Sequence, residues 1–185
     1  MVALAGAAVC TVCDHLHATN DVLSYPHVFV WDQAWWVPLL FAGASLVIVS
    51  SAGMLRRLLG GRPLDAPSAR VVAGDGLAFV TAYAFTAYAH TLPNVVAGVL
   101  FAWWLARVLD GAPVWLIVYS VAVGVGGTLF EAGWSALGFF HYHHADFLGV
   151  PRWLPGIYLH VAFLTAGLER LLRGSHEPPA AAVAA

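Results

Sequence analysis

Histidines gather in one short polar segment that separates two long apolar runs of the sequence. His141, His143, His144 and Asp146 follow one another closely there. Imidazole nitrogens and carboxylate oxygens are ligands for iron and zinc, so a group of this density could hold a metal ion. The segment is therefore the first candidate for a catalytic centre.

A second polar group lies near the end of the first apolar run. His15 and His17 follow Asp14 and could add ligands from the same face. The combined pattern resembles fragments of the histidine boxes of membrane di-iron oxygenases, but the repeated boxes of those enzymes are missing. A histidine-ligated membrane oxidoreductase, similar to a desaturase or hydroxylase, stays as the alternative hypothesis. The favoured reading expects no catalytic residue and no metal.

Glu131 is the one acidic side chain well inside a long apolar run. A carboxylate is costly to place in a membrane, so it indicates either a function or a protonated side chain that bonds a neighbouring helix. Asp75, near a membrane boundary, can be satisfied by Arg70 or by water. Cys10 and Cys13 lie in an apolar segment and are interpreted as small packing residues.

The composition indicates that lipid is the solvent of this chain. Of its 185 residues, 61% are hydrophobic and only 10% are charged, and its mean hydropathy is +0.78. Soluble domains carry about 25% charged residues. The net charge of −2 gives no reason to expect a nucleic-acid partner. We expect an all-α, multi-pass membrane protein, with no cleaved leader because no basic stretch precedes the first apolar run.

Six apolar segments qualify as membrane-spanning helices, which need about 20 residues. No loop between them has room for a soluble domain, so residues 1–173 are predicted to form a single transmembrane domain. Residues 174–185 are predicted to form a disordered cytosolic tail. The six segments are residues 2–18, 35–58, 71–91, 93–109, 113–140 and 153–173.

The arginines predict the orientation, since the chain contains no lysine. Every arginine except Arg152 falls on one side of the six predicted spans, and loops rich in positive charge face the cytosol. Both termini are therefore expected in the cytosol and both histidine groups on the opposite face, where di-iron boxes do not lie. The lysine-free, alanine-rich composition indicates a high-GC bacterium and hence its inner membrane. The arginines on the cytosolic side are Arg56, Arg57, Arg62, Arg70, Arg107, Arg170 and Arg173.

The third and fifth predicted spans point to a cavity. Phe79, Tyr83, Thr86 and His90 recur at the spacing of one helical face. The fifth span is rich in glycine, which either allows close helix packing or leaves a cleft. The functional interpretation is a lipid cavity between these helices. The side chains expected to contact lipid are Phe79, Tyr83, Trp134 and Phe139, with Glu131 as a hydrogen-bond partner.

Several motifs resemble those of the Insig (insulin-induced gene) family of membrane sterol sensors. The most specific one is Asp146-Phe147-Leu148 followed by Trp153-Leu154-Pro155. Trp35-Trp36-Val37-Pro38 resembles a second family motif, Trp103-Trp104 a third, and Phe79-Val80 a weaker fourth. The resemblance covers residues 35 to about 172 in the same order.

This resemblance implies six transmembrane helices, both termini in the cytosol, and a sterol bound within the bundle. It places Phe79 against the ligand and Tyr142 near the cavity mouth, and Thr86 and Asn94 complete the expected lipid-binding set. We expect a bound sterol or diacylglycerol-type lipid, no other cofactor, and a homodimer or homotrimer as candidate assemblies. The animal protein partners are not expected, because the composition indicates a bacterium. The order of Arg107 and Asp110 also departs from the family pattern at the partner-binding acid.

The polar segment 142–155 is thus expected to be the outer turn between spans five and six. Pro151 and Pro155 restrict the bend, and Trp153 is predicted to anchor the membrane interface. We interpret the turn as the lid of a lipid cavity.

Overall fold

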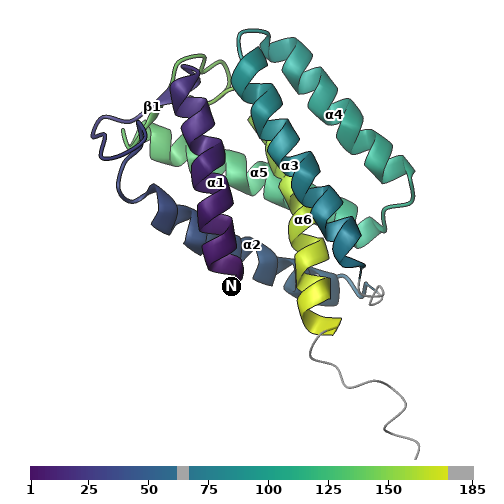
Figure 1. The fold of residues 1–185 in the computed structure, drawn as a ribbon. Coiled ribbons are helices and arrows are strands. Elements are labelled where there is room, and N and C mark those ends of the chain that lie inside the picture. The colour runs from purple at the N-terminus through teal and green to yellow at the C-terminus, as the bar shows by residue number, and fades with distance from the viewer. Residues whose placement is uncertain (62–66, 175–185) are drawn as a thin grey trace, which may run out of the picture.

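The computed structural model describes residues 1–61 and 67–174 as a bundle of six helices capped by a pair of very short strands (Figure 1). The predicted all-α membrane fold with six helices is confirmed. The predicted tail, apart from Gly174, and Arg62 lie outside the described residues. The helices are α1 (Val2–Thr19), α2 (Val37–Leu58), α3 (Ala69–Ala89), α4 (Pro93–Leu109), α5 (Val114–Ala136) and α6 (Leu154–Gly174), and the strands are β1 (Leu23–Ser24) and β2 (His141–Tyr142).

Four of the described helices, α1, α2, α3 and α5, are long and apolar enough to cross a membrane, and α4 is a shorter apolar helix of 17 residues. Helix α6 carries the polar side chains of His160, Thr165 and Glu169, all of them buried. It contacts α2, α3, α4 and α5. Protein rather than lipid therefore surrounds these polar groups, which explains how a less apolar helix runs through the bundle.

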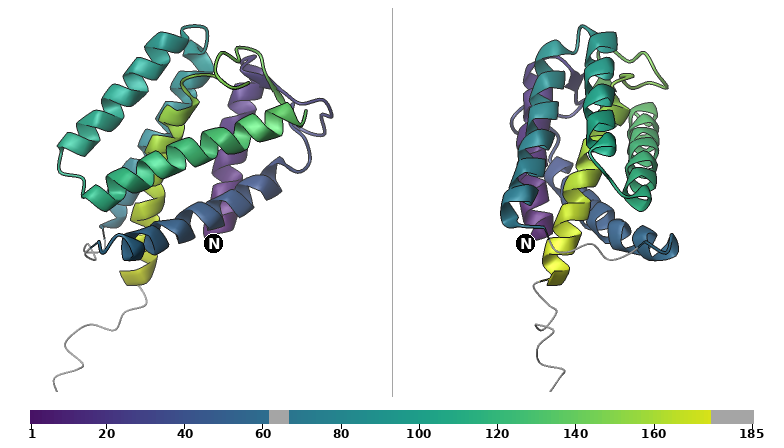
Figure 2. Two further views of the ribbon diagram at one scale, coloured as in Figure 1. Left: turned by 180° about the vertical axis from the view of Figure 1, so that it is seen from behind. Right: turned by 90° about the vertical axis from the view of Figure 1, so that its right-hand side faces the viewer.

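Helix α6 lies between two pairs of helices. Figure 2 shows α1 and α3 on one side of it and α2 and α5 on the other. The N-terminus and the end of α6 lie at the same end of the bundle (Figure 1), as an even number of spans requires. Their cytosolic location stays a prediction from the arginines.

Helix α5 ends at Ala136, four residues before the predicted end at 140. Gly138 follows with a positive φ of 78°. Its N–H donates to Ser135 O at 2.9 Å, and the Phe139 N–H donates to Trp134 O at 3.1 Å. This pair of bonds is the Schellman pattern, in which a glycine in the left-handed conformation ends a helix. The chain leaves the helix there and extends into β2.

Strands β1 and β2 join the two longest outer loops. They pair antiparallel, with Leu23 opposite Tyr142 and Ser24 opposite His141. The His143 N–H adds a bond of 3.0 Å to Val22 O. Residues 20–36 and 137–153 therefore form one connected cap over the end of the bundle opposite the N-terminus, which the predicted orientation makes the outer end.

Two expectations about single side chains are wrong. Trp153 is not an interface anchor, because it is fully buried, with its ring 5.8 Å from His17 and 6.4 Å from Tyr142. The outer turn points this ring inward at the start of α6. Asp75 forms an ion pair with Arg107 of α4 rather than with Arg70.

Candidate functional site

A cavity of about 610 Å³ lies among α1, α2, α3, α5, α6 and the outer cap. This volume is within the range of about 300–1,000 Å³ that small-molecule sites occupy. Its apolar part is lined by α2 from Val37 to Ile48 and by one face of α5 from Val123 to Trp134. The cavity thus runs along these two helices, starting at the cap.

The cavity opens between α2 and α5. Leu39, Val47 and Phe130 line it and are also exposed, at 64%, 68% and 45% of their surfaces. Both helices meet the length and composition of membrane spans. The opening therefore faces the space that lipid tails occupy.

The glycines of α5 have two different roles, and each of the two interpretations applies to one face of the helix. Gly124 and Gly127 pack against α6: a Cβ at Gly124 would lie 3.3 Å from Leu159, and one at Gly127 would overlap the ring of Tyr158. Gly126 and Gly127 both line the cavity, but a Cβ at Gly126 would meet nothing within 4 Å. Gly43 on α2 is open in the same way. Close packing on one face leaves a cleft on the other.

Glu131 forms one half of the polar end of the cavity. The hydroxyl of Tyr158 donates to Glu131 Oε1 at 2.5 Å, and the hydroxyl of Tyr142 donates to Oε2. Burial raises the pKa of Tyr142 well above its usual range, and the neighbouring Glu131 raises it further. Tyr142 therefore keeps its proton and remains a donor.

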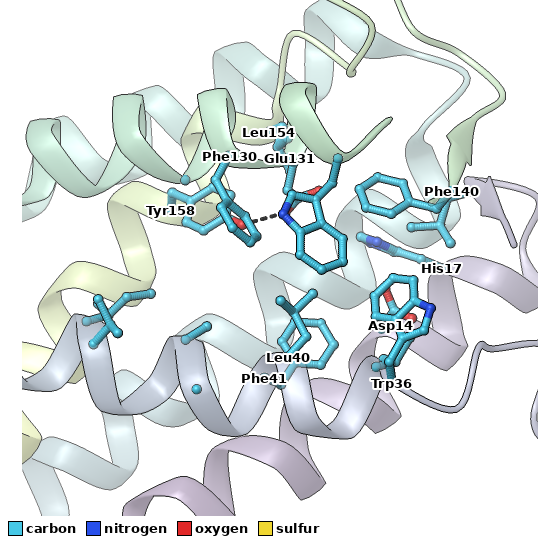
Figure 3. A pocket seen from close by; sticks show the side chains of 18 of the residues that line it. Asp14, His17, Trp36, Leu40, Phe41, Phe130, Glu131, Phe140, Leu154 and Tyr158 are labelled. Carbon is cyan, nitrogen blue, oxygen red and sulfur yellow. Dashed lines mark hydrogen bonds between the residues drawn. The ribbon is translucent and has the colours of Figure 1, made fainter. Parts of the chain in front are cut away.

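Asp14 forms the other half of the polar end. Its Oδ2 accepts hydrogen bonds from Tyr25 Oη at 2.7 Å and from Gln33 Nε2 at 2.6 Å. Gln33 also donates to the carbonyl of Thr11 at 2.9 Å. Burial, and secondarily Asp14, raises the pKa of Tyr25. Figure 3 shows Asp14 and His17 on one side of the polar end, and Glu131 with Tyr158 on the other.

His17 connects this end to α3. Its Nε2 lies 2.8 Å from Thr86 Oγ1, and its ring stacks on Tyr83 at 4.7 Å. Thr86 donates its only hydroxyl proton to the carbonyl of Tyr83 at 2.8 Å, so we assign a proton to His17 Nε2. Thr86 itself supports the wall from behind, since it is fully buried and does not line the cavity.

Aromatic rings surround the polar groups. Trp36 lies 5.2 Å from Trp134 and 5.7 Å from Tyr25, and Tyr25 lies 6.1 Å from Phe140. All four line the cavity. The site thus combines an apolar channel with a compact end in which carboxylates and tyrosines lie among aromatic rings.

Of the predicted lipid-contact residues, four line the main cavity: Tyr83, Glu131, Trp134 and Tyr142. Phe79 lines a neighbouring pocket of about 60 Å³, and its ring lies 5.1 Å from Tyr83. The lipid contacts themselves stay predictions.

Three other predicted contacts lie away from the cavity surface. Thr86 is behind its wall, as described above. Asn94 lies in the outer region, where its Oδ1 accepts a bond of 2.7 Å from Arg152 Nη1. Phe139 packs on Trp134 at 4.4 Å from the outer side and is 42% exposed.

The most specific family motif builds the outer turn. Asp146 accepts two bonds of 2.7 Å from Arg152, one from its backbone N–H and one from Nε. Phe147 and Val150 exchange two backbone bonds of 2.9 Å. Between them Leu148 and Gly149 have φ of 53° and 81°, as a tight turn with left-handed central residues requires. The motif therefore fixes a loop, and Trp153 is its inward anchor.

The remaining motif residues are divided between cavity, core and surface. Trp36 lines the cavity, and Trp35 is 64% exposed. Trp103 packs at 4.4 Å from His160 of α6. Pro155 lies in the first turn of α6, facing Gly124 of α5.

Sequence reasoning missed Tyr25, Gln33 and Tyr158 as site residues and considered Asp14 and His17 only as metal ligands. The spacing of Asp14 and His17 places them on one helical face and was a usable signal. The sequence carries no such signal for Tyr158, because its partner Glu131 belongs to another helix.

The histidines do not assemble. In residues 1–61 and 67–174, no group of three or more His, Cys, Asp or Glu side chains is placed to hold a metal ion. His15 Nδ1 bonds Trp31 O at 2.8 Å, His143 bonds Ser24 Oγ at 3.0 Å, and the ring of His144 lies 5.3 Å from that of His90. The ligand set that the alternative hypothesis needs, from His15 and His17 to His141, is not brought together.

The fold and the site define a class: multi-pass, all-α membrane proteins with a cavity inside the bundle. Among solved structures, the chain is similar to that of MvINS, a mycobacterial Insig homologue from Mycobacterium vanbaalenii, with 26% identity and a TM-score of 0.82 over 96% of this chain and 94% of that one. A cross-linked trimer of MvINS gives a TM-score of 0.79 with the same identity and coverage. No protein-family model and no curated protein matches the chain. The chain is an Insig-like membrane protein, and the resemblance inferred from its motifs is confirmed.

Proposed function

We propose that this protein binds a membrane lipid of the sterol or diacylglycerol type in the cavity and acts as a lipid sensor. The observation that carries the proposal is the shape and chemistry of the cavity. It is apolar along α2 and α5, opens between these helices, and closes at Asp14 and Glu131.

An amphipathic lipid with a small head fits this arrangement. Its tail would bury apolar surface along α2 and α5, which contributes about 25 cal/mol for each Å² removed from water. Its hydroxyl group would donate to Asp14 or Glu131, whose oxygens line the polar end. Buried polar groups need such partners, so the polar end orients the head toward the cap.

The proposal is one of binding rather than catalysis, at the inner membrane of a bacterium and with both termini in the cytosol. The cross-linked MvINS structure is a trimer, and a homotrimer is our candidate assembly for this chain. The rival metal oxidoreductase makes a different prediction. Elemental analysis of purified protein would then find stoichiometric iron or zinc that is lost in His143→Ala and His144→Ala.

The test is lipid retention. Native mass spectrometry and lipid extraction of the protein in mild detergent should show about one retained lipid per chain. Gly126→Phe should abolish retention, because its ring would fill the cavity where a Cβ meets no neighbour. Gly133→Phe is the matched control: it lies on the same helix, is equally open, and does not line the cavity. Retention that is absent in the unmodified protein, or equal in both variants, would contradict the proposal.

A further inference from the structure

The loop between α1 and α2 carries a run of exposed apolar side chains. Val28, Phe29, Val30 and Trp31 are consecutive in the chain, and each exposes more than half of its surface. None of the four lines the cavity. A loop that faces water rarely exposes four consecutive apolar side chains, so this run indicates a surface that contacts an apolar partner.

These side chains lie on a tight hairpin. The Gln33 N–H donates to Val30 O at 3.0 Å, and the Phe29 N–H donates to Gln33 O at 2.8 Å. The two residues at the tip, Trp31 and Asp32, both have a positive φ, of 54° and 56°. A two-residue turn of this kind favours asparagine and glycine, and a tryptophan is unusual there. The hairpin is therefore a defined structure that presents an aromatic ring at its tip.

Two contacts with α1 fix the depth of the hairpin. His15 Nδ1 donates to Trp31 O at 2.8 Å, and Gln33 Nε2 donates to the carbonyl of Thr11 at 2.9 Å. At a rise of about 1.5 Å per residue, His15 and Thr11 lie about 6 Å and about 12 Å inside the end of α1 at Thr19. The loop thus runs beside the outer half of α1 before it reaches α2 (Figure 1). Both helices qualify as membrane spans, so the hairpin lies within the depth of the membrane.

The composition of the loop fits the boundary between lipid headgroups and tails. Residues 20–36 contain no arginine or lysine, and their charged residues are Asp21 and Asp32. Attraction to anionic headgroups needs basic side chains, which this loop lacks. Tryptophan favours the boundary between headgroups and tails, about 5–7 Å below the membrane surface. The contact between Trp31 and His15 places the hairpin tip at a similar depth below the end of α1.

We propose that the hairpin of residues 28–32 inserts its apolar side chains into the leaflet around the outer end of the bundle and anchors the start of α2 there. The partner is the acyl-chain boundary of the bilayer, not an anionic headgroup. The exposed apolar surface continues through Trp35 into α2, which is itself a membrane span. This surface is separate from the cavity, so the inference does not rest on the proposed lipid binding.

Quenching of a single fluorescent label measures the insertion. Phe29→Cys, in a Cys10→Ala/Cys13→Ala background, is labelled with bimane and placed in nanodiscs of dioleoylphosphatidylcholine. Because a side chain buried about 5–10 Å into the interface lies near the acyl chains, lipid with brominated tails should remove more than about half of the emission, and aqueous iodide little of it. Ala145→Cys, at an exposed position of the other outer loop, is the matched control and should respond in the opposite way. Equal iodide quenching at the two positions, or shielding of the label at 29 from both quenchers by a second protein copy, would overturn the proposal.

A second variant tests the two aromatic rings without a label at Phe29. Phe29→Ser/Trp31→Asn removes both rings, and asparagine suits the left-handed conformation at the tip, so the turn should still form. A label at Val30→Cys should then lose its quenching by brominated lipid down to the level of Ala145→Cys. Unchanged quenching would show that the rings do not insert.

The charge of the lipid provides the remaining test. Adding dioleoylphosphatidylglycerol to the nanodiscs should leave the quenching of the Phe29→Cys label by brominated lipid unchanged, because the loop has no basic side chain. A requirement for this anionic lipid would overturn insertion through the apolar side chains.

Discussion

Tyr158 on α6 donates a hydrogen bond of 2.5 Å to Glu131 on α5. Gly127, one turn before Glu131 on α5, makes room for the Tyr158 ring, which a Cβ at that position would overlap. The pair of helices with the most extensive mutual packing in the bundle is therefore joined by a polar contact inside the membrane, at the wall of the cavity.

Loss of this contact should destabilise the bundle. Tyr158→Phe removes a buried hydrogen bond to a carboxylate and should lower the free energy of unfolding by about 1.5–3 kcal/mol. Thermal unfolding in detergent measures the change. Tyr88→Phe is the control, because Tyr88 is 71% exposed and should unfold like the unmodified protein. Equal unfolding of both variants would show that the bond contributes nothing.

Adjacent glycines on α5 should respond in opposite directions to alanine. Gly127→Ala forces its methyl group into the ring of Tyr158 and should cost about 1–3 kcal/mol through overpacking. Gly126→Ala places its methyl group in open space and should stabilise the helix by up to about 1 kcal/mol. Chemical unfolding of both proteins tests the pair. The same sign for both changes would refute the assignment of the two faces.

The cap should depend on one buried amide. Gln33 links the outer loop to α1 through Asp14 and Thr11, and it is among the most deeply buried side chains. Gln33→Leu leaves Asp14 with one donor fewer and should cost about 1–3 kcal/mol. His27→Ala, at an exposed position of the same loop, should cost less than about 0.5 kcal/mol. Protease cleavage within residues 20–36 should rise only in Gln33→Leu, and equal cleavage of both variants would contradict this role.

Stability should fall at high pH. The folded-state pKa values of Tyr25 and Tyr142 are raised by burial, while an unfolded tyrosine titrates near about 10. The unfolded chain therefore loses these protons first, so the contribution is fully present below about pH 10 and is lost as the pH rises beyond it. Unfolding followed from pH 8 to 11 measures the slope. Tyr142→Phe should make the slope shallower, and an unchanged slope would rule out this source.

Periodicity and apolar length predicted the helices well, because the signal for a membrane span is a continuous run of apolar residues. The end of α5 was missed even though Gly138 carries the local signal for it. Contacts such as that between Asp14 and Tyr25 could not be predicted from the sequence, since they depend on how a loop folds back onto α1. Trp153 shows a related difficulty, because an aromatic ring near a helix end suits the membrane interface and the protein core equally well. The conformation of the turn before Trp153 determines which of the two locations its ring occupies.

The pairing of β1 with β2 has a consequence for exchange with the surroundings. It ties the α1–α2 connection to the α5–α6 connection directly above the polar end. Access from the aqueous side would require those strands to separate, whereas the passage between α2 and α5 already faces the hydrocarbon. A lipid would then enter the cavity laterally from the membrane, between α2 and α5, with its tail and its head together. Under the proposed function, the spacing between α2 and α5 would then depend on whether the cavity holds a lipid.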